Sequence, residues 1–345
     1  MNKRTRTTLL FAALVLALLA GAIYLRKNAP PEAARLLPES DGIVYVNLRP
    51  LRAATHFDQH PVTHPADYQH FIDATGIVWE RDLEEAAFAL HHTDDPTGPN
   101  GLVAYSYVLV GKLDGKRFAQ YFDAQAASTE TYDGHTIYSI GSDGRTVRLA
   151  QLGYDMVAVS NTPTSEQIHS ILDRYRSAAL PFAGSTLLSE HYSQVPLLSM
   201  AWGIGKIGLP LIEGGHLQLM GFQIPVAMDT TFVASLRWVG SLRLRVEEFA
   251  PSESAAALSA SGLQSVVAVA RTAEAAFPNT AANADIKNLL NSTQVSQNKD
   301  RMIVTATVPQ NIVQHLVTPP AMSGTDPQQS DSQQTNPDQA KPPGW

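Results

Sequence analysis

Three histidines spaced four residues apart are the first candidates for chemistry in this sequence. On a helix, His56, His60 and His64 would share one face, where imidazole nitrogens can bind a transition metal. Pro61 and Pro65 interrupt such a helix, and no acidic residue stands in the HExxH position of a zinc hydrolase. We therefore expect surface histidines, and we keep a histidine-based metal-binding module as an alternative.

A cluster of carboxylates is the second candidate. Glu80, Asp82, Glu84 and Glu85 bunch around Arg81 at the entry to an expected strand. The two carboxylates of a glycosidase flank a cleft, about 5–10 Å apart. A bunched set beside an arginine is more typical of a solvated turn. Two further polar pairs are expected at solvated strand ends, His91-His92 and Glu247-Glu248.

Glycines after another expected strand match the dinucleotide-binding pattern GxGxxG. They are Gly203, Gly205 and Gly208, and Asp229 stands about where a ribose-binding acid would. In that fold the motif opens a helix, but Pro210 and several glycines interrupt the chain here, and no parallel βαβ pattern surrounds it. We interpret the motif as a glycine-rich strand exit and predict no cofactor.

Composition excludes several further classes. The 345 residues include no cysteine, which removes disulfides, thiolate metal sites and cysteine nucleophiles together. The formal net charge of −7 argues against nucleic-acid binding, which favours a basic surface. The sequence contains no GxSxG, Walker A or HExxH motif. A hydrolase with a dispersed Ser-His-Asp site therefore stays an alternative without a motif to support it.

An uncharged apolar segment precedes all of these residues. As a helix, Leu9–Leu25 would span roughly 26 Å, close to the apolar thickness of a bilayer. Tyr24, Arg26 and Lys27 suit the membrane interface. We predict a single-pass anchor in the bacterial inner membrane, with the remainder periplasmic or extracellular. The alternative is a signal peptide cleaved after Ala22.

Hydropathy and turn residues predict the elements that follow the anchor. A helix is expected over 66–75, ended by Gly76, and another begins after Asp114. Asp133-Gly134 and Asp143-Gly144 predict hairpins, and Thr162-Pro163 predicts a helix start.

The second half of the chain repeats the order of the first. LLSMAWGI corresponds to IVYVNL, FVASLRWV and SLRLRVEEF correspond to LEEAAFAL and YSYVLVGKL, and MIVTATVPQ corresponds to MVAVSNTPT. The predicted fold class is α+β: an N-terminal transmembrane helix followed by two related units, each an antiparallel sheet with helices packed on one face. The expected boundaries are a cytoplasmic tail at 1–7, the anchor at 8–25, a linker at 26–35, units at 36–176 and 177–318, and a disordered tail at 319–345.

A Gly- and Pro-punctuated apolar stretch lies in the second unit. It contains Leu217, Leu219, Met220, Phe222, Ile224, Val226 and Met228. We interpret it as a core hairpin, with an exposed surface for lipid or a protein partner as the alternative.

Several segments together resemble a known type of protein. They are LLPESDGIVYVNL, DATGIVWERDLEEAAFAL, ETYDGHTIYSI and DMVAVSNTPTSEQIHSILD, which follow the apolar segment. The pattern resembles an uncharacterised bacterial family of membrane-anchored envelope proteins built on duplicated α+β units. The resemblance implies an extracytoplasmic protein and supplies no catalytic residues. We predict a tethered binding or scaffold protein without catalysis, whose partners are the bilayer, through Leu9–Leu25, and a protein or lipid ligand.

Overall fold

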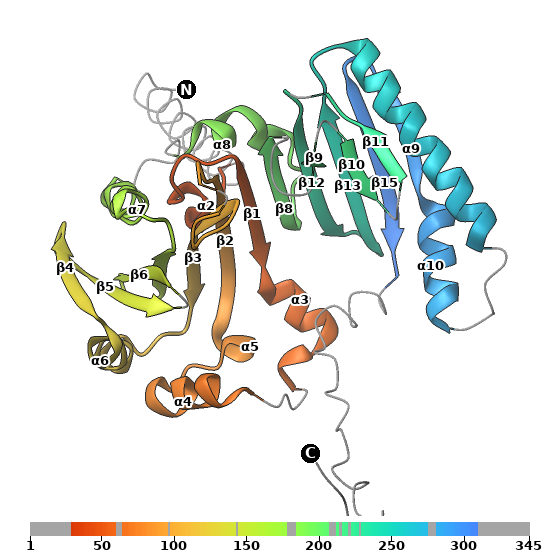
Figure 1. Cartoon of the computed structure of the whole chain (residues 1–345). Helices are drawn as coiled ribbons and strands as arrows, with labels where there is room; N and C mark the ends of the chain where they lie inside the picture. Colours follow the sequence, from red (N-terminus) through yellow and green to blue (C-terminus); the bar gives the residue numbers. More distant parts are fainter. Residues whose placement is uncertain are drawn as a thin grey trace, which may run out of the picture.

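One large antiparallel sheet organises the chain (Figure 1). The computed structural model describes residues 29–59, 64–95, 97–142, 144–177, 184–206, 212–213, 216–219, 222–227, 229–274 and 281–309. The strands of the large sheet are β1 (Gly42–Asn47), β2 (Leu83–His92), β3 (Val103–Gly111), β4 (Ser128–Tyr132), β5 (His135–Ser142), β6 (Arg145–Leu152), β7 (Met156–Ser160), β8 (Ser199–Lys206), β12 (Thr231–Trp238), β13 (Leu242–Phe249), β14 (Gln294–Asn298) and β15 (Arg301–Val308). Their spatial order is β14-β15-β13-β12-β8-β1-β2-β3-β7-β6-β5-β4.

Helices and a small second sheet flank these strands. The helices are α2 (Glu32–Arg35), α3 (Leu48–Thr55), α4 (Ala66–Thr75), α5 (Trp79–Asp82), α6 (Gly115–Gln125), α7 (Glu166–Arg176), α8 (Thr186–His191), α9 (Glu253–Glu274) and α10 (Ala281–Ser292), with 3₁₀ turns at Phe57–Gln59 and Tyr192–Gln194. The small sheet holds β9 (Ile212–Glu213), β10 (His216–Leu219) and β11 (Phe222–Pro225). In Figure 1, α9 and α10 lie beside β15, far from α4 and α6.

The strand order of the second half repeats that of the first, but the predicted pair of separate sheets is wrong. The order β8-β12-β13-β15-β14 mirrors β1-β2-β3-β7-β6. The two halves join edge to edge because β1 pairs with β8, with Ile43 opposite Ile204 and Tyr45 opposite Trp202. The last two rings stack with centroids 5.4 Å apart. Pairing satisfies two strand edges that separate sheets would expose.

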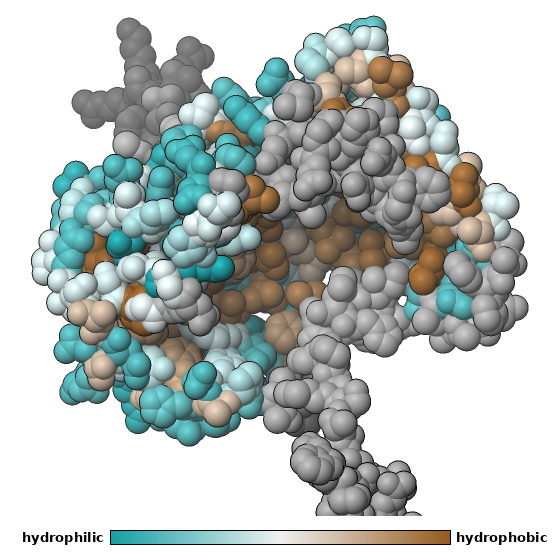
Figure 2. Space-filling model, in the orientation of Figure 1, coloured by the Kyte–Doolittle hydropathy of each residue, from teal (hydrophilic) through white to brown (hydrophobic). Residues whose placement is uncertain are grey.

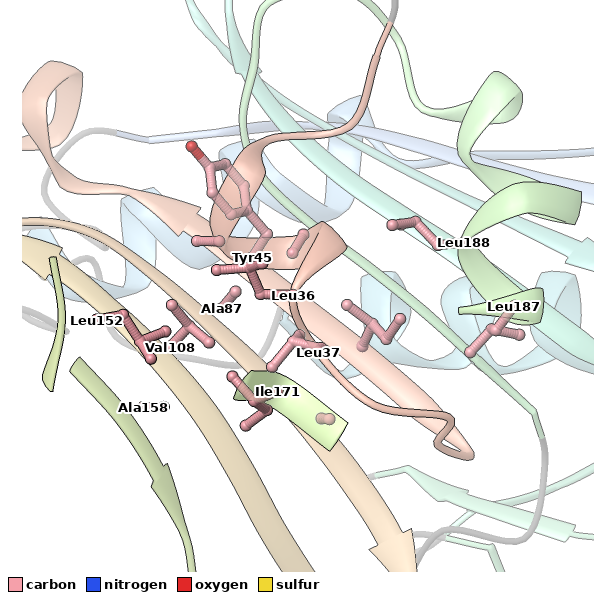
Figure 3. Close-up of a cluster of buried hydrophobic side chains, with 14 of the residues drawn as sticks. Leu36, Leu37, Tyr45, Ala87, Val108, Leu152, Ala158, Ile171, Leu187 and Leu188 are labelled. Carbon is pink, nitrogen blue, oxygen red and sulfur yellow. The ribbon is translucent and has the colours of Figure 1, made fainter. Parts of the chain in front are cut away.

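Helices cover both faces of the sheet, which also corrects the predicted single covered face. On one face, α2, α7 and α8 bury the main core, drawn in Figure 3. Leu37, Ile171 and Leu188 pack there against Tyr45 and Val108 from the strands. On the opposite face, α4 and α6 enclose a second, aromatic cluster. Its buried members are Phe71, Ile77, Phe118, Tyr138, Leu149, Val157 and Val159.

Several local predictions are confirmed. Helix α4 spans Ala66–Thr75 and ends at Gly76, whose φ of 75° is left-handed. The Asp114 side chain accepts hydrogen bonds from the first backbone N–H groups of α6. Asp133 and Gly134 join β4 to β5 with positive φ angles. Helix α7 starts at Glu166, slightly later than Thr162-Pro163 suggested.

The described residues do not show the predicted membrane helix. Leu9–Leu25 lies outside the described residues, and in the part that the structure describes no helix is both long and apolar enough to cross a bilayer. The fold class of the described part is therefore one large antiparallel sheet with helices, without the transmembrane helix of the prediction, and the location of the folded part stays a prediction. The expected tail at 319–345 also lies outside the described residues. Helix α2 occupies the end of the expected linker and buries Ala33 and Ala34.

Candidate functional site

The centre of the large sheet presents small side chains on one face. In-register partners on antiparallel strands share a face. Gly203 of β8 lies opposite Val44 of β1 on one side and Ala234 of β12 on the other. The neighbouring positions of β8 on this face are Ala201 and Gly205. Strand β8 therefore forms a floor with almost no side chains.

Larger apolar side chains rise on both sides of this floor. The middle row across the sheet is Phe88, Val44, Gly203, Ala234, Val246 and Val304. The row nearer α3 is Ala86, Val46, Ala201, Leu236, Leu244 and Ala306. Val44 is exposed, and the neighbouring positions on this face are half-buried. We call this set the central trough: Val44, Val46, Phe88, Ala201, Gly203, Gly205, Phe232, Ala234, Leu236, Leu244 and Val246.

The described helices cover this face only at its two ends. The aromatic cluster under α4 and α6 ends near Tyr107, which contacts Phe88 with ring centroids 5.7 Å apart. At the other end, α9 packs Leu263 and Val266 against Phe232. Between them Val44 is 37% exposed. Figure 2 shows apolar side chains gathered in a hollow between the two halves. An apolar hollow of this kind marks a binding surface more often than a folding accident.

A buried carboxyl group lies at the α9 end of the trough. Glu248 is in register with Phe232 and is fully buried, so the predicted solvated strand end is wrong. Its Oε1 accepts a 2.8 Å hydrogen bond from Ser259 Oγ of α9, whereas Oε2 has no partner among the described residues. Burial raises the pKa of Glu248, against the opposing effect of the Ser259 hydrogen bond. The alternation of Leu242, Leu244, Val246 and Glu248 could have placed this group on the apolar face.

Glu247 is also buried, on the opposite face. Arg245 Nε donates to Glu247 Oε1 at 2.6 Å, and Arg301 lies 3.8 Å from Oε2. The carboxylate charge is thus compensated. The two neighbouring glutamates therefore differ: Glu247 forms ion pairs with arginines, whereas Glu248 has no cationic partner within the described ranges.

The predicted acidic cluster does not form a pair of catalytic carboxylates. Glu80 Oε2 accepts from Tyr68 OH at 2.8 Å, and Glu84 pairs with Arg49. Asp82 is buried and binds Arg81 at 2.7 Å. Together with Lys112 and Asp114, some of these residues line a polar hollow of about 830 Å³. Its charges largely neutralise one another, which leaves little net field for a charged ligand.

The histidine candidates do not converge in the described part of the chain. His56 is exposed with a φ of 52° at the end of α3, next to Gln59. His64 Nδ1 lies 3.7 Å from Glu80 Oε1, and its ring meets Tyr68 edge-on. His60 lies outside the described residues. Among those that are described, no group of three potential ligands could hold a metal ion, and the three-histidine site stays a prediction.

A serine–histidine contact does occur, but it is closed to substrate. His91 Nε2 lies 3.0 Å from Ser106 Oγ, which lies 3.1 Å from Ser160 Oγ. Thr162 Oγ1 extends the chain at 2.8 Å. Both serines are fully buried, and His91 is buried too, so the predicted solvated strand end is wrong at this residue. Burial lowers the pKa of His91. This polar chain links β2, β3 and β7 and satisfies buried groups, since a nucleophile must reach its substrate.

The GxGxxG glycines have a different role from phosphate binding. Gly203 and Gly205 lie inside β8, in the middle of an antiparallel sheet, and the next described element along the chain is the strand β9, not a helix. Gly208 lies outside the described residues, and Asp229 stands in the turn before β12. The predicted hairpin at 217–228 is present as β10 and β11, and Val226 is buried beside Val266 of α9.

Comparison with known proteins adds a distant likeness only. No protein-family model and no curated protein matches the sequence. Three crystal forms of the protein TP0453 resemble the structure. Form III gives a TM-score of 0.45 at 11% identity, over 84% of this chain and 97% of that one. Form I gives 0.42 at 10%, over 84% and 96%, and form IV gives 0.42 at 9%, over 83% and 94%. We take no function from a likeness at this level.

Proposed function

We propose that this protein is a non-catalytic binding protein whose central trough takes a flexible aliphatic chain, such as that of a lipid. The observation that carries the proposal is the half-buried apolar floor around Gly203, which has larger apolar side chains of β1 and β12 beside it in the hollow between the two halves (Figure 2). Nothing in the trough itself is charged. An apolar ligand would remove this surface from water, at about 25 cal/mol for each Å² buried.

The shape of the trough favours a chain over a compact ligand. From Ala201 to Gly205 the floor runs along β8 for roughly 13 Å, at about 3.3 Å for each residue. Adjacent strands lie about 4.8 Å apart, so the flanking strands β1 and β12 are separated by roughly 10 Å. Because side chains of β1 and β12 stand within that width, the strip of small residues along β8 suits a single row of methylene groups. The buried Glu248 carboxyl lies next to one end of this groove, so the two ends differ chemically.

Filling the floor with a side chain tests the proposal. A Cβ added at Gly203 would lie 3.5 Å from Ile43 O and 3.7 Å from Val44 Cγ2, which are ordinary contacts. Gly203→Phe should therefore fold and occupy the trough, and Gly203→Ala is the matched control. If the phenyl ring displaces four methylene groups, at about 0.8 kcal/mol each, affinity falls by about 3 kcal/mol, or roughly a hundredfold.

The measurement is the binding of a fluorescent fatty acid to the full chain, by titration of its emission. Because both variants keep every other apolar segment, their difference isolates the trough. We expect Gly203→Ala to bind within about twofold of the parent and Gly203→Phe to bind far more weakly. Ala234→Phe, on the neighbouring strand, is the second variant. If folded Gly203→Phe and folded Ala234→Phe both bind the fatty acid as tightly as the parent does, the proposed site is refuted.

A further inference from the structure

Four exposed apolar side chains gather at one end of the sheet. Leu197 and Leu198 precede β8 and are 65% and 90% exposed. Trp238 is the last residue of β12 and Val239 follows it, and they are 42% and 50% exposed. Ser199 and Arg237 are register partners, so the two segments continue side by side beyond the paired strands. We call these four residues the apolar tip.

The backbone of the tip is also strained. Leu198 has a φ of 64°, a left-handed conformation that leucine rarely adopts. Such a conformation persists where the surroundings impose it, and it often marks a functional position. Here it holds a leucine almost wholly in water. Neither the exposure nor the strain stabilises the isolated fold.

Two arginines stand behind the tip. Arg237 of β12 lies directly opposite Arg243 of β13, and like charges in this position repel. Neither makes an ion pair within the described part of the chain, although the protein carries a formal net charge of −7. An unneutralised cationic pair beside apolar side chains is complementary to a surface that is both apolar and anionic.

We propose that the apolar tip docks on an anionic lipid bilayer surface, with Trp238, Val239 and the two leucines in the interface and the arginines at the headgroups. Tryptophan is enriched at this depth of a membrane, and basic residues are attracted to anionic leaflets. A protein partner fits less well, because a stable interface buries about 800 Å² on each side, and four side chains at two loop ends offer much less. This inference does not depend on what the trough binds.

The absence of cysteine allows a site-specific test in the full chain. A single cysteine at Val239→Cys carries an environment-sensitive fluorophore. The matched control is Leu102→Cys. Leu102 is another exposed apolar loop residue, and it lies just before β3, at the end of the large sheet that faces away from the apolar tip. Both proteins are mixed with phosphatidylcholine vesicles, with and without phosphatidylglycerol. Attachment through any other segment would affect the two labels alike.

We expect a blue shift and a severalfold rise in emission for the Val239→Cys label on vesicles that contain phosphatidylglycerol, with quenching by a lipid labelled near its headgroup. The Leu102→Cys label should stay in water. Leu198→Gly, which relieves the positive φ, and Arg237→Gln with Arg243→Gln should each weaken the response without unfolding the protein. A label that remains aqueous on both vesicles, or that shifts with protein concentration alone because copies associate, would overturn the proposal.

Discussion

Glu248→Gln should remove a pH dependence of stability that has its origin under α9. The Glu248 carboxyl is fully buried, has one hydrogen bond from Ser259, and has its pKa raised by burial. The folded protein therefore holds this proton more tightly than the unfolded chain. Its contribution to the free energy of unfolding is greatest below the ordinary pKa of a glutamate, and it falls as pH rises toward the higher folded pKa.

The magnitude follows from linkage. Each pKa unit of difference between the folded and unfolded protein corresponds to about 1.4 kcal/mol. Glutamine keeps the size of the side chain and its acceptor for Ser259 but cannot ionise. The parent should therefore lose stability relative to Glu248→Gln as pH rises from the ordinary pKa of a glutamate through the raised pKa of the folded protein. The variant keeps a polar group in the same buried place. If the substitution only loosened the packing, it would lower the free energy of unfolding by the same amount at every pH and would not change its dependence on pH.

Urea unfolding of both proteins at several pH values is the assay, followed by tryptophan fluorescence or circular dichroism. The quantity of interest is the difference between the two free energies of unfolding at each pH, because every other titrating group, His91 included, cancels in it. A difference that does not vary with pH would refute the raised pKa of the buried Glu248. A difference that varies in the opposite direction would mean that the carboxylate is the stable form.

Three further predictions concern the scaffold. Burial lowers the pKa of His91, so its contribution to stability should be lost as pH falls below about 6.5. Ser106→Ala should lower the free energy of unfolding in urea by about 1–2 kcal/mol, because it removes the hydroxyl that His91 and Ser160 both contact. An unchanged urea midpoint would contradict the buried polar chain. Burial disfavours the charge of Asp82, but hydrogen bonds from Arg81 and the Val78 N–H outweigh it and lower the pKa of Asp82. The ionised Asp82 therefore stabilises the fold at pH values above the ordinary pKa of an aspartate, and this contribution is lost as pH falls. Asp82→Asn should lower the free energy of unfolding by about 2 kcal/mol at neutral pH. Equal thermal midpoints for the variant and the parent would refute this. Gly76→Ala should lower the free energy of unfolding by about 1 kcal/mol, because the φ of Gly76 is 75°. Gly141→Ala is the control and should leave stability unchanged, because Gly141 has no positive φ and an added Cβ would meet no atom within 4 Å. Equal effects of the two substitutions would count against the role of Gly76 in ending α4.

Local sequence determined the features that depend on a few neighbouring residues. The cap at Asp114 needs only the N–H groups two and three positions later, and the end of α4 needs only a residue that tolerates a positive φ at Gly76. The turn at Asp133-Gly134 is equally local. The repeated strand order was also readable, because each strand carries its own alternation of apolar residues.

Only the tertiary structure decided which faces are covered and which strands meet. The sequences of β1 and β8 do not specify that these strands pair. The alternation of apolar residues determines which side chains share a face of a strand, but it does not determine which strand lies beside it. That pairing merges two expected sheets into one and places Gly203 beside Val44. Helices that end on either side then leave this centre uncovered, and α9 buries Glu248 although its sequence suggested a solvated strand end. Burial depends on residues far apart in the chain, so the trough and its acid could not be derived from local pattern alone.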